Sequence, residues 1–412
     1  MSAPAPLAAT ATVTQPAPPA SPAAVRLGSV DAYRGLVMLL IMAEQLRTAA
    51  VAKAVPDSPV WRFLATQQEH VAWTGAVLHD MIQPSFSFLV GVALPFSVGN
   101  RRARGLSPEA VTGHAFLRAL ILILLGIILR SASYTFEDTL TQIGLGYGFL
   151  YLLALRSVRV QWAALAVILV GYWLAFALWP LPGPNFDWAS AGVSPDFASN
   201  ATGFAAHWNK NTNPAWAFDT WFLNLFPREK PFQFNQGGYA TLSFIPTLGT
   251  MILGLIAGEI LRSERPKVAK VRWFVIAGVI GLAVGWGLGA TGICPVVKRI
   301  WTPSWVLFSG GWCFLGLAAF YAVIDVCGWR AWAFPLVVVG MNSIAAYVMD
   351  HLLPAFLRET LQNHLTLQTH FGPRLIGFVA PAYAPFAIGV GVIALLWLIL
   401  YGMWRKKIFL RI

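Results

Sequence analysis

Long apolar blocks constrain this chain more than any other feature of its sequence. Most blocks approach or exceed the roughly 20 residues that an α-helix needs to cross a bilayer. Of the 412 residues, 57% are hydrophobic and only 11% are charged, whereas soluble domains carry about 25% charged residues. A soluble enzyme of this size is therefore excluded, and the sequence predicts an all-α, polytopic transmembrane helix bundle.

The blocks predict about ten spans. They lie near residues 33–51, 81–99, 115–131, 138–155, 161–180, 241–262, 271–291, 304–325, 332–351 and 385–404. The fourth block is polar and rich in glycine, and the first has an uninterrupted apolar run only from Gly35 to Ala43. We therefore expect these two helices to face the interior of the protein. Residues 27–412 are expected to form one transmembrane domain.

The amino-terminal segment and the basic residues predict the orientation. Residues 1–26 are almost entirely Ala, Pro, Ser, Thr and Val, so we expect a disordered tail. Because the tail lacks the pattern of a cleaved signal peptide, the first span is expected to act as the export signal. More than half of the 29 Lys and Arg residues fall in short segments on one side of the predicted membrane. We therefore expect a bacterial inner (cytoplasmic) membrane protein with both termini cytoplasmic.

The formal net charge of +12 follows from this orientation pattern, so the lipid bilayer, and no nucleic acid, is the expected partner. Between spans five and six lies a long extracytoplasmic loop, residues 181–240. A loop of this length is usually functional or disordered. Its aromatic content fits either a packed lid over the bundle or an aromatic belt on the membrane surface. The aromatic residues are Trp208, Trp216, Trp221, Phe222, Phe226, Phe232 and Phe234.

Polar residues interrupt the first span. Glu44, Gln45 and Arg47 occur near its outer end, and ionisable groups inside a bundle are functional candidates because they are costly to bury. Glu44 and Arg47 are three residues apart and could pair on one helix face. A structural ion pair is the alternative to a functional role, and Gln45 needs a hydrogen-bond partner in either case.

The start of the second span is also polar. Asp80, Gln83 and Ser87 stand at i, i+3 and i+7, so one face of this helix is polar and could line a wet cavity. Just upstream, Glu69 and His70 place a carboxylate beside an imidazole at the membrane surface. An imidazole is well suited to accept a proton near neutral pH, although a single loop histidine is more often inert.

Other motifs are weaker. Gln142 heads a glycine-rich stretch in the fourth block and Asn342 interrupts the ninth; we treat both as cofactor-binding candidates, although small residues there more often permit close helix packing. His364 and His370 have poor spacing for a metal site, and no metal is expected. The sequence has no Walker loop, Rossmann glycine pattern, zincin motif or Ser-His-Asp elbow.

The order of several motifs resembles the catalytic domain of the heparan-α-glucosaminide N-acetyltransferase family and its bacterial relatives. The similarity covers nearly everything after the tail. The matching segments are RLGSVDAYRG (26–35), His70 with Trp73 and Gly75, DMIQPSFSFLVGVALPFS (80–97), LTQIGLGY (140–147), YATLSFIPTLGTMILGLIAG (239–258), VKRIWTPSW (297–305) and VGMNSIAAYV (339–348).

This resemblance implies a membrane enzyme that moves acetyl from acetyl-CoA to the amino group of a terminal glucosamine across the membrane. The family's active-site histidine corresponds to His70, three residues before Trp73, and its acidic residue corresponds to Asp80. Gln45 stands where the eukaryotic enzyme has Asn. Basic residues at the inner ends of the first two spans could bind the anionic end of CoA, although such residues are more often only topology anchors. These residues are Arg34, Arg101, Arg102 and Arg104.

We therefore hypothesise an acetyl-CoA-dependent N-acetyltransferase that acts on an amino sugar or glycan at the outer face. The catalytic candidates are His70, Gln45, Asp80 and Glu69. His70 would serve either as the base for direct transfer or as a transient acyl carrier. An amino-sugar transporter is the alternative, and it would predict two related halves with paired broken helices; the sequence has no such halves. A homodimer is one expected assembly.

Overall fold

The computed structural model describes residues 27–130, 134–366 and 379–410, and these residues form helices, turns and loops without strands. The prediction of a disordered tail concerns residues 1–26, which are outside the described residues. The longer helices are α1 (Gly28–Met42), α4 (Ile82–Ala103), α5 (Pro108–Arg130), α6 (Thr139–Ala154), α7 (Val158–Ala177), α10 (Phe244–Arg262), α11 (Lys267–Ala290), α12 (Pro303–Tyr321), α15 (Pro354–Thr366) and α16 (Ala384–Arg405). The shorter α-helices are α2 (Thr48–Ala54), α3 (Pro59–Gln68), α8 (Trp188–Ala191), α9 (Pro214–Phe222), α13 (Phe334–Gly340) and α14 (Ser343–Leu352).

Eight helical segments of the described chain are long and apolar enough to cross a membrane. A further one is broken, because Ala331–Gly340 and Ser343–Leu352 meet at a bend of 68°. The remaining predicted span is α6, an apolar helix of 16 residues. The expectation of a polytopic helical bundle is confirmed. The short helix α6 and the bent α13–α14 pair both contribute residues to the site described below.

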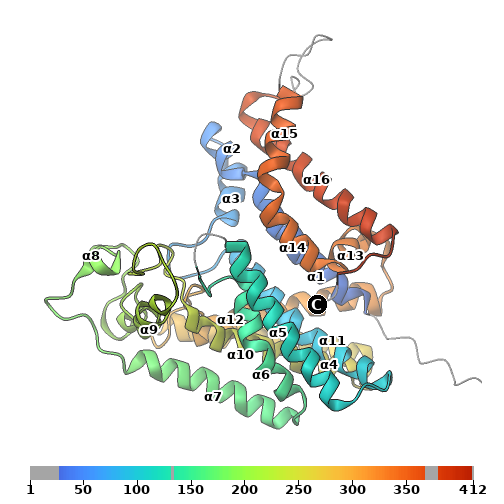
Figure 1. The fold of residues 1–412 in the computed structure, drawn as a ribbon, viewed down its shortest axis with the longest axis horizontal. Coiled ribbons are helices and arrows are strands. Elements are labelled where there is room, and N and C mark those ends of the chain that lie inside the picture. The colour runs from blue at the N-terminus through green and yellow to red at the C-terminus, as the bar shows by residue number, and fades with distance from the viewer. Residues whose placement is uncertain (1–26, 131–133, 367–378, 411–412) are drawn as a thin grey trace, which may run out of the picture.

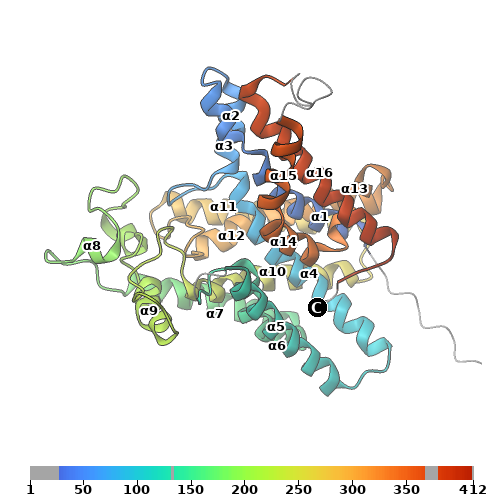
Figure 2. The ribbon, with the colours of Figure 1, turned by 45° about the horizontal axis from the view of Figure 1, so that its top comes forward.

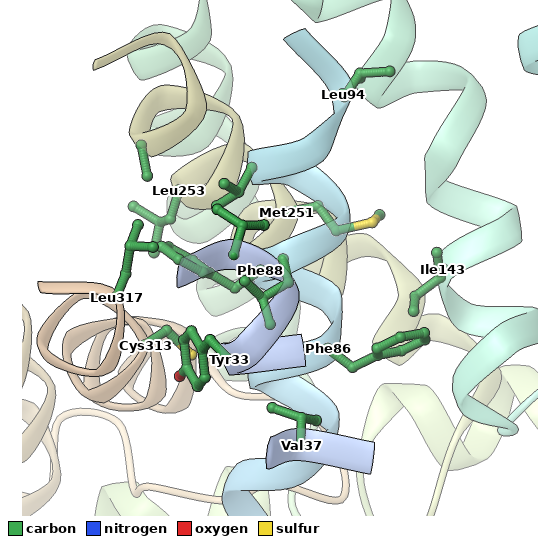
Figure 3. Close-up of a cluster of buried hydrophobic side chains, with 14 of the residues drawn as sticks. Tyr33, Val37, Phe86, Phe88, Leu94, Ile143, Met251, Leu253, Cys313 and Leu317 are labelled. Carbon is green, nitrogen blue, oxygen red and sulfur yellow. The ribbon is translucent and has the colours of Figure 1, made fainter. Parts of the chain in front are cut away.

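Glycines let the central helices α4 and α10 approach closely. A Cβ on Gly91 would overlap the carbonyl of Met251, and one on Gly254 would overlap the carbonyl of Phe88. Small residues at such positions bring backbones together, which is how helices pack in lipid without a hydrophobic driving force. Phe88 and Met251 are fully buried in the core around this contact (Figure 3).

The first helix is held by the same device. Gly35 of α1 packs on the backbone of Leu336, and Gly340 of α13 packs on the backbone of Asp31. α1 ends at Met42 and continues as a short 3₁₀ helix, η1 (Ala43–Leu46), after which Arg47 adopts a left-handed conformation with φ 49°. The α-helix therefore ends just before Glu44 and Gln45, which lie in the 3₁₀ turn between α1 and the break at Arg47.

The segment between α7 and α10 is folded against the bundle. Trp208 is 0% exposed, stacks on Phe176 and accepts a hydrogen bond at its carbonyl from the indole of Trp73 at 2.9 Å. Figures 1 and 2 show α8 and α9 at one end of the molecule. Because Trp73 lies three residues after His70, this packing ties the segment to the chain around His70. The sequence did not decide between a packed lid and an aromatic belt on the membrane surface. The burial of Trp208 favours a segment that packs against the bundle.

Candidate active site

A cavity of about 530 Å³ lies where the ends of several helices meet. Its walls come from η1, the chain around His70, the start of α4, the end of α5, the start of α6, residues 235–239 and α14. The lining is mainly polar. The ionisable residues in it are Glu44, His70, His79, Arg130, Glu137, Tyr239, Lys298, Tyr347, Asp350 and His351.

His70 and Asp80 form a hydrogen-bonded pair on one wall. The Nδ1 atom of His70 lies 2.7 Å from Oδ1 of Asp80. Asp80 is 1% exposed and belongs to the 3₁₀ helix η2 (Leu78–Met81), where its Oδ2 accepts the backbone N–H of Val77 at 3.2 Å. Because an ionised carboxylate only accepts hydrogen bonds, this contact places the ring proton on Nδ1. Nε2 is then the ring nitrogen that can accept a proton from a substrate.

Lys298 completes this centre from a distant part of the chain. Its Nζ lies 3.4 Å from Oδ1 of Asp80 and 3.3 Å from Nδ1 of His70. The side chain is buried, and burial lowers the pKa of Lys298 to about 8, although the Asp80 carboxylate acts in the opposite direction. The sequence did not single out Lys298, since it lies in VKRIWTPSW, a segment read only as a family motif.

The loop that carries Lys298 is fixed on several sides. The Thr302 hydroxyl accepts the backbone N–H of Val297 at 3.0 Å. The Arg299 guanidinium donates to the carbonyls of Gly237 at 2.6 Å and Val71 at 3.1 Å. The lysine loop, the chain around His70 and the segment before α10 are therefore joined by charge-assisted hydrogen bonds.

Glu44 and His79 form a second pair beside His70. Nε2 of His79 lies 3.3 Å from Oε1 of Glu44, and the rings of His79 and His70 have centroids 4.5 Å apart. The expected pairing of Glu44 with Arg47 is therefore wrong, because the break after η1 turns Arg47 out of the helical register that would place it beside Glu44.

Gln45 lines the cavity and is held by Arg358. Nη2 of Arg358 donates to the backbone carbonyl of Gln45 at 2.5 Å and approaches its side-chain oxygen at 3.4 Å. With the oxygen turned to the guanidinium, the amide NH₂ of Gln45 is the group left for a ligand. Arg358 is buried in α15, so a helix near the end of the chain positions a residue of the first span.

Further polar groups line the cavity. Glu137 accepts a hydrogen bond from Asn235 at 3.1 Å, and burial raises the pKa of Glu137. The Arg299 guanidinium lies 5.2 Å from the ring of Tyr239, whose pKa is raised by burial. The long segment between α7 and α10 thus contributes Asn235, Gly237 and Tyr239 to the cavity.

A second cavity of about 250 Å³ adjoins the first. Thr139 lines one cavity and the next residue, Leu140, lines the other. Between them Phe86 of the second cavity stacks on Tyr347 of the first, with ring centroids 6.5 Å apart and an interplanar angle of 6°. Tyr347 is held in place by its hydroxyl, which donates to Asp138 at 3.0 Å.

Three arginines line this second cavity, and they are Arg34, Arg101 and Arg118. Arg34 and Arg101 were CoA-binding candidates from the sequence, and the structure places them together. Arg102 is the next residue along α4 and does not line the cavity, since consecutive helical side chains point about 100° apart. Arg118 was read only as a charge within a span; its Nη1 donates to the Tyr147 hydroxyl at 3.2 Å.

The remaining candidates lie elsewhere. Glu69 is exposed and lines neither cavity. Gln142 is buried and donates to the carbonyls of Phe136 and Thr241, and Asn342 is buried between the backbones of Ile408 and Leu410. The last two side chains therefore support the fold in this structure and do not reach the arginine cavity.

Among the described residues no group of three or more His, Cys, Asp or Glu side chains is placed to hold a metal ion. The chemistry that the site can perform is proton transfer and nucleophilic attack at His70, next to a polar cavity that can hold a small molecule.

Two known proteins are similar to this chain over most of its length. No protein-family model matches the chain. It is 25% identical to heparan-alpha-glucosaminide N-acetyltransferase of Homo sapiens over 433 aligned positions, and 24% identical to that of Mus musculus over 431 positions. Both alignments cover 94% of this chain, which spans 60% of the length of each relative. The chain is a homologue of heparan-alpha-glucosaminide N-acetyltransferase.

Proposed function

We propose that this protein is a transmembrane acyltransferase that moves acetyl from cytoplasmic acetyl-CoA to the amino group of an amino sugar or glycan at the outer face. One observation carries the proposal: the His70–Asp80 pair faces a polar cavity, and that cavity adjoins an arginine-lined one. Homology to an N-acetyltransferase supports the same activity. The basic residues near the chain ends favour a cytoplasmic position for the arginine cavity.

The arginine cavity suits the anionic end of acetyl-CoA. Guanidinium groups bind phosphates with paired, charge-assisted hydrogen bonds, and Arg34, Arg101 and Arg118 surround one space. From there the acyl-bearing arm would pass the stacked rings of Phe86 and Tyr347 to reach His70. We therefore propose that these two rings move apart when the donor binds.

The His70 cavity suits a protonated amine. It contains the carboxyl groups of Glu44 and Asp350, and Oδ1 of Asp350 is buried without a hydrogen-bond partner among the described residues. A cationic acceptor would supply the missing partner. Hydroxyl groups of a sugar could bond to Gln45, Gln83 and Asn235, which line the same space.

In direct transfer, Nε2 of His70 accepts a proton from the acceptor ammonium, and the free amine attacks the thioester carbonyl. The C–N bond forms and the nitrogen loses its second proton to solvent, while the C–S bond breaks and the leaving thiolate takes the proton that the imidazolium returns. In the two-step alternative, Nε2 itself attacks the carbonyl, the C–S bond breaks and the thiolate leaves; the amine then attacks the acetyl-imidazole, the bond to Nε2 breaks, and the two amine protons pass to the thiolate and to solvent. Both routes need Nδ1 protonated and held by Asp80.

The proposal is tested with purified protein in detergent micelles, acetyl-labelled acetyl-CoA and glucosamine. We expect one free thiol and one N-acetylated sugar to appear in equal amounts. A transporter would instead accumulate glucosamine in proteoliposomes without CoA and release no thiol. Exchange of labelled CoA into acetyl-CoA without acceptor would identify the two-step route, because only an acyl-His70 intermediate returns acetyl to CoA.

A further inference from the structure

Lys298 contacts both members of the His70–Asp80 pair, yet it has no role in the transfer steps above. We propose that Lys298 is a positioning residue that keeps the imidazole of His70 neutral, and therefore able to accept a proton. The proposal rests on the proposed function insofar as it concerns turnover, but the charge state of His70 can be measured without turnover.

The geometry gives the ammonium a direct effect on the imidazole. Nζ of Lys298 lies 3.3 Å from Nδ1 of His70, which already carries a proton for its hydrogen bond to Asp80. The ammonium therefore cannot bond to Nδ1 and acts on the ring only by its charge. Protonation of Nε2 would place a second positive charge beside the first, and like charges this close disfavour the doubly charged state.

Asp80 alone would have the opposite effect. A carboxylate 2.7 Å from an imidazole stabilises the imidazolium, and a ring that is already protonated at both nitrogens cannot accept another proton. With Lys298 bound to the same oxygen at 3.4 Å, the carboxylate charge is shared. Asp80 still fixes the orientation and tautomer of His70, while the ammonium removes most of the drive toward the imidazolium.

No other charged group of the described chain replaces this ammonium. Arg299 stacks on Tyr239 and donates to two carbonyls, and its contacts do not include the His70 ring. Glu44 is paired with His79 and, as a carboxylate, favours the imidazolium. The titratable groups that interact with His70 are Glu44, His79, Asp80, Tyr239 and Lys298. The other ionisable groups that line the same cavity are Arg130, Glu137, Tyr347, Asp350 and His351.

The position of Lys298 is suited to this role because it is rigid and charged near neutral pH. Lys298 is 5% exposed, and its loop is anchored by Thr302 and Arg299. Its pKa, lowered by burial to about 8, still leaves the ammonium predominantly protonated at pH 7. The effect of the charge is thus present over the range in which an imidazole changes protonation state.

The test measures the protonation of His70 chemically. Diethyl pyrocarbonate modifies an imidazole only in its neutral form, and peptide mass spectrometry reports the rate at His70 itself between pH 5 and 9. We expect Lys298→Met to raise the midpoint of that profile by at least about one pH unit, since a charge at this distance shifts a titration by about 1–3 units. Lys298→Arg, which keeps the charge, should restore the midpoint, and the exposed control Lys53→Met should not move it.

The transfer reaction provides a second readout. The acid limb of the kcat/KM profile should move upward in Lys298→Met by the same amount, so that activity below the limb falls about tenfold and recovers at high pH. A purely structural role would lower activity equally at all pH values. If the wild type transfers no acetyl, the proposed function fails, whereas the modification profile still decides the role of Lys298.

Two outcomes overturn the inference. One is an unchanged midpoint in a folded Lys298→Met protein. The other is an equal shift in Lys298→Met and Lys298→Arg, which would assign the effect to shape and not to charge. If Lys298→Met fails size-exclusion chromatography, Lys298→Gln is the replacement, because its neutral amide can still donate to Asp80 and preserve the loop.

Discussion

Asp80→Asn separates the positioning of His70 from the presence of its imidazole. The amide keeps the size of the carboxyl group but lacks its charge, so it can no longer fix the proton on Nδ1 of His70 or pair with Lys298. We expect a protein that folds and binds acetyl-CoA normally but transfers acetyl much more slowly.

The substitution changes two quantities, the rate of transfer and the stability of the fold. General base catalysis by a positioned side chain contributes about 10²–10⁴ in rate, and Asp80→Asn should remove most of it from kcat. The loss of stability is smaller, because Lys298 can release its proton. With a pKa of about 8, neutralising Lys298 at pH 7 costs about 1.4 kcal/mol, which limits the penalty for leaving its charge unpaired.

The assay measures kcat and the KM for acetyl-CoA at pH 7 in wild type, Asp80→Asn and Asp57→Asn, an exposed control in the loop after α2. We expect kcat to fall at least 100-fold in Asp80→Asn with little change in KM, and no change in Asp57→Asn. An Asp80→Asn protein with a kcat within about threefold of the wild type would refute the role given to the pair.

Three further predictions concern other parts of the molecule. Arg101→Gln should raise the KM for acetyl-CoA about tenfold with little change in kcat, while the exposed Arg104→Gln leaves it unchanged; equal KM values in both variants would contradict the donor site. Asp219, which is 3% exposed and accepts the N–H of Thr241, has a pKa raised by burial to about 7. A raised folded-state pKa favours the protonated form, so the free energy of unfolding should fall by roughly 4 kcal/mol between about pH 4 and 7. Asp219→Asn should make the melting temperature less dependent on pH in this range; an unchanged pH dependence would contradict this. Gly91→Ala should lower the melting temperature strongly or prevent folding, since its Cβ would overlap Met251, whereas Gly113→Ala, which meets nothing within 4 Å, should be neutral or stabilising by differential scanning fluorimetry; similar melting temperatures would contradict the close contact of α4 and α10.

Hydropathy was sufficient to predict the architecture. The long apolar blocks predicted the helices that the structure contains, because a bilayer permits little else for an apolar chain of this length. The same pattern could not predict that the ninth block bends by 68° at Met341 and Asn342. Next to the bend, Gly340 packs on the backbone of α1, which is a contact between distant parts of the chain that hydropathy does not reveal.

The candidate site was only partly accessible to sequence reasoning. His70 and Asp80 are ten residues apart, and local motifs drew attention to both. Lys298 is 228 residues from His70, and nothing in its own segment indicates a catalytic neighbour. The family motif containing Lys298 was the one available signal, and it gave no role.

Polar residues in apolar blocks were an ambiguous signal for ligand binding. Gln142 and Asn342 stand out in the sequence in the same way as Gln45, yet their side chains bond to neighbouring backbone groups. Gln45 lies at a helix break and lines the cavity. Sequence shows that a buried amide needs a partner, and only the fold decides whether that partner is protein or ligand.

Transfer across the bilayer is best measured in proteoliposomes of known orientation, with labelled acetyl-CoA on the arginine-cavity side and glucosamine only on the His70 side. We predict labelled N-acetylglucosamine in the glucosamine compartment, and a rate at least 100-fold lower for a correctly folded His70→Ala protein. Product formation that requires both substrates on the same side, or transfer by His70→Ala at the wild-type rate, would contradict the account.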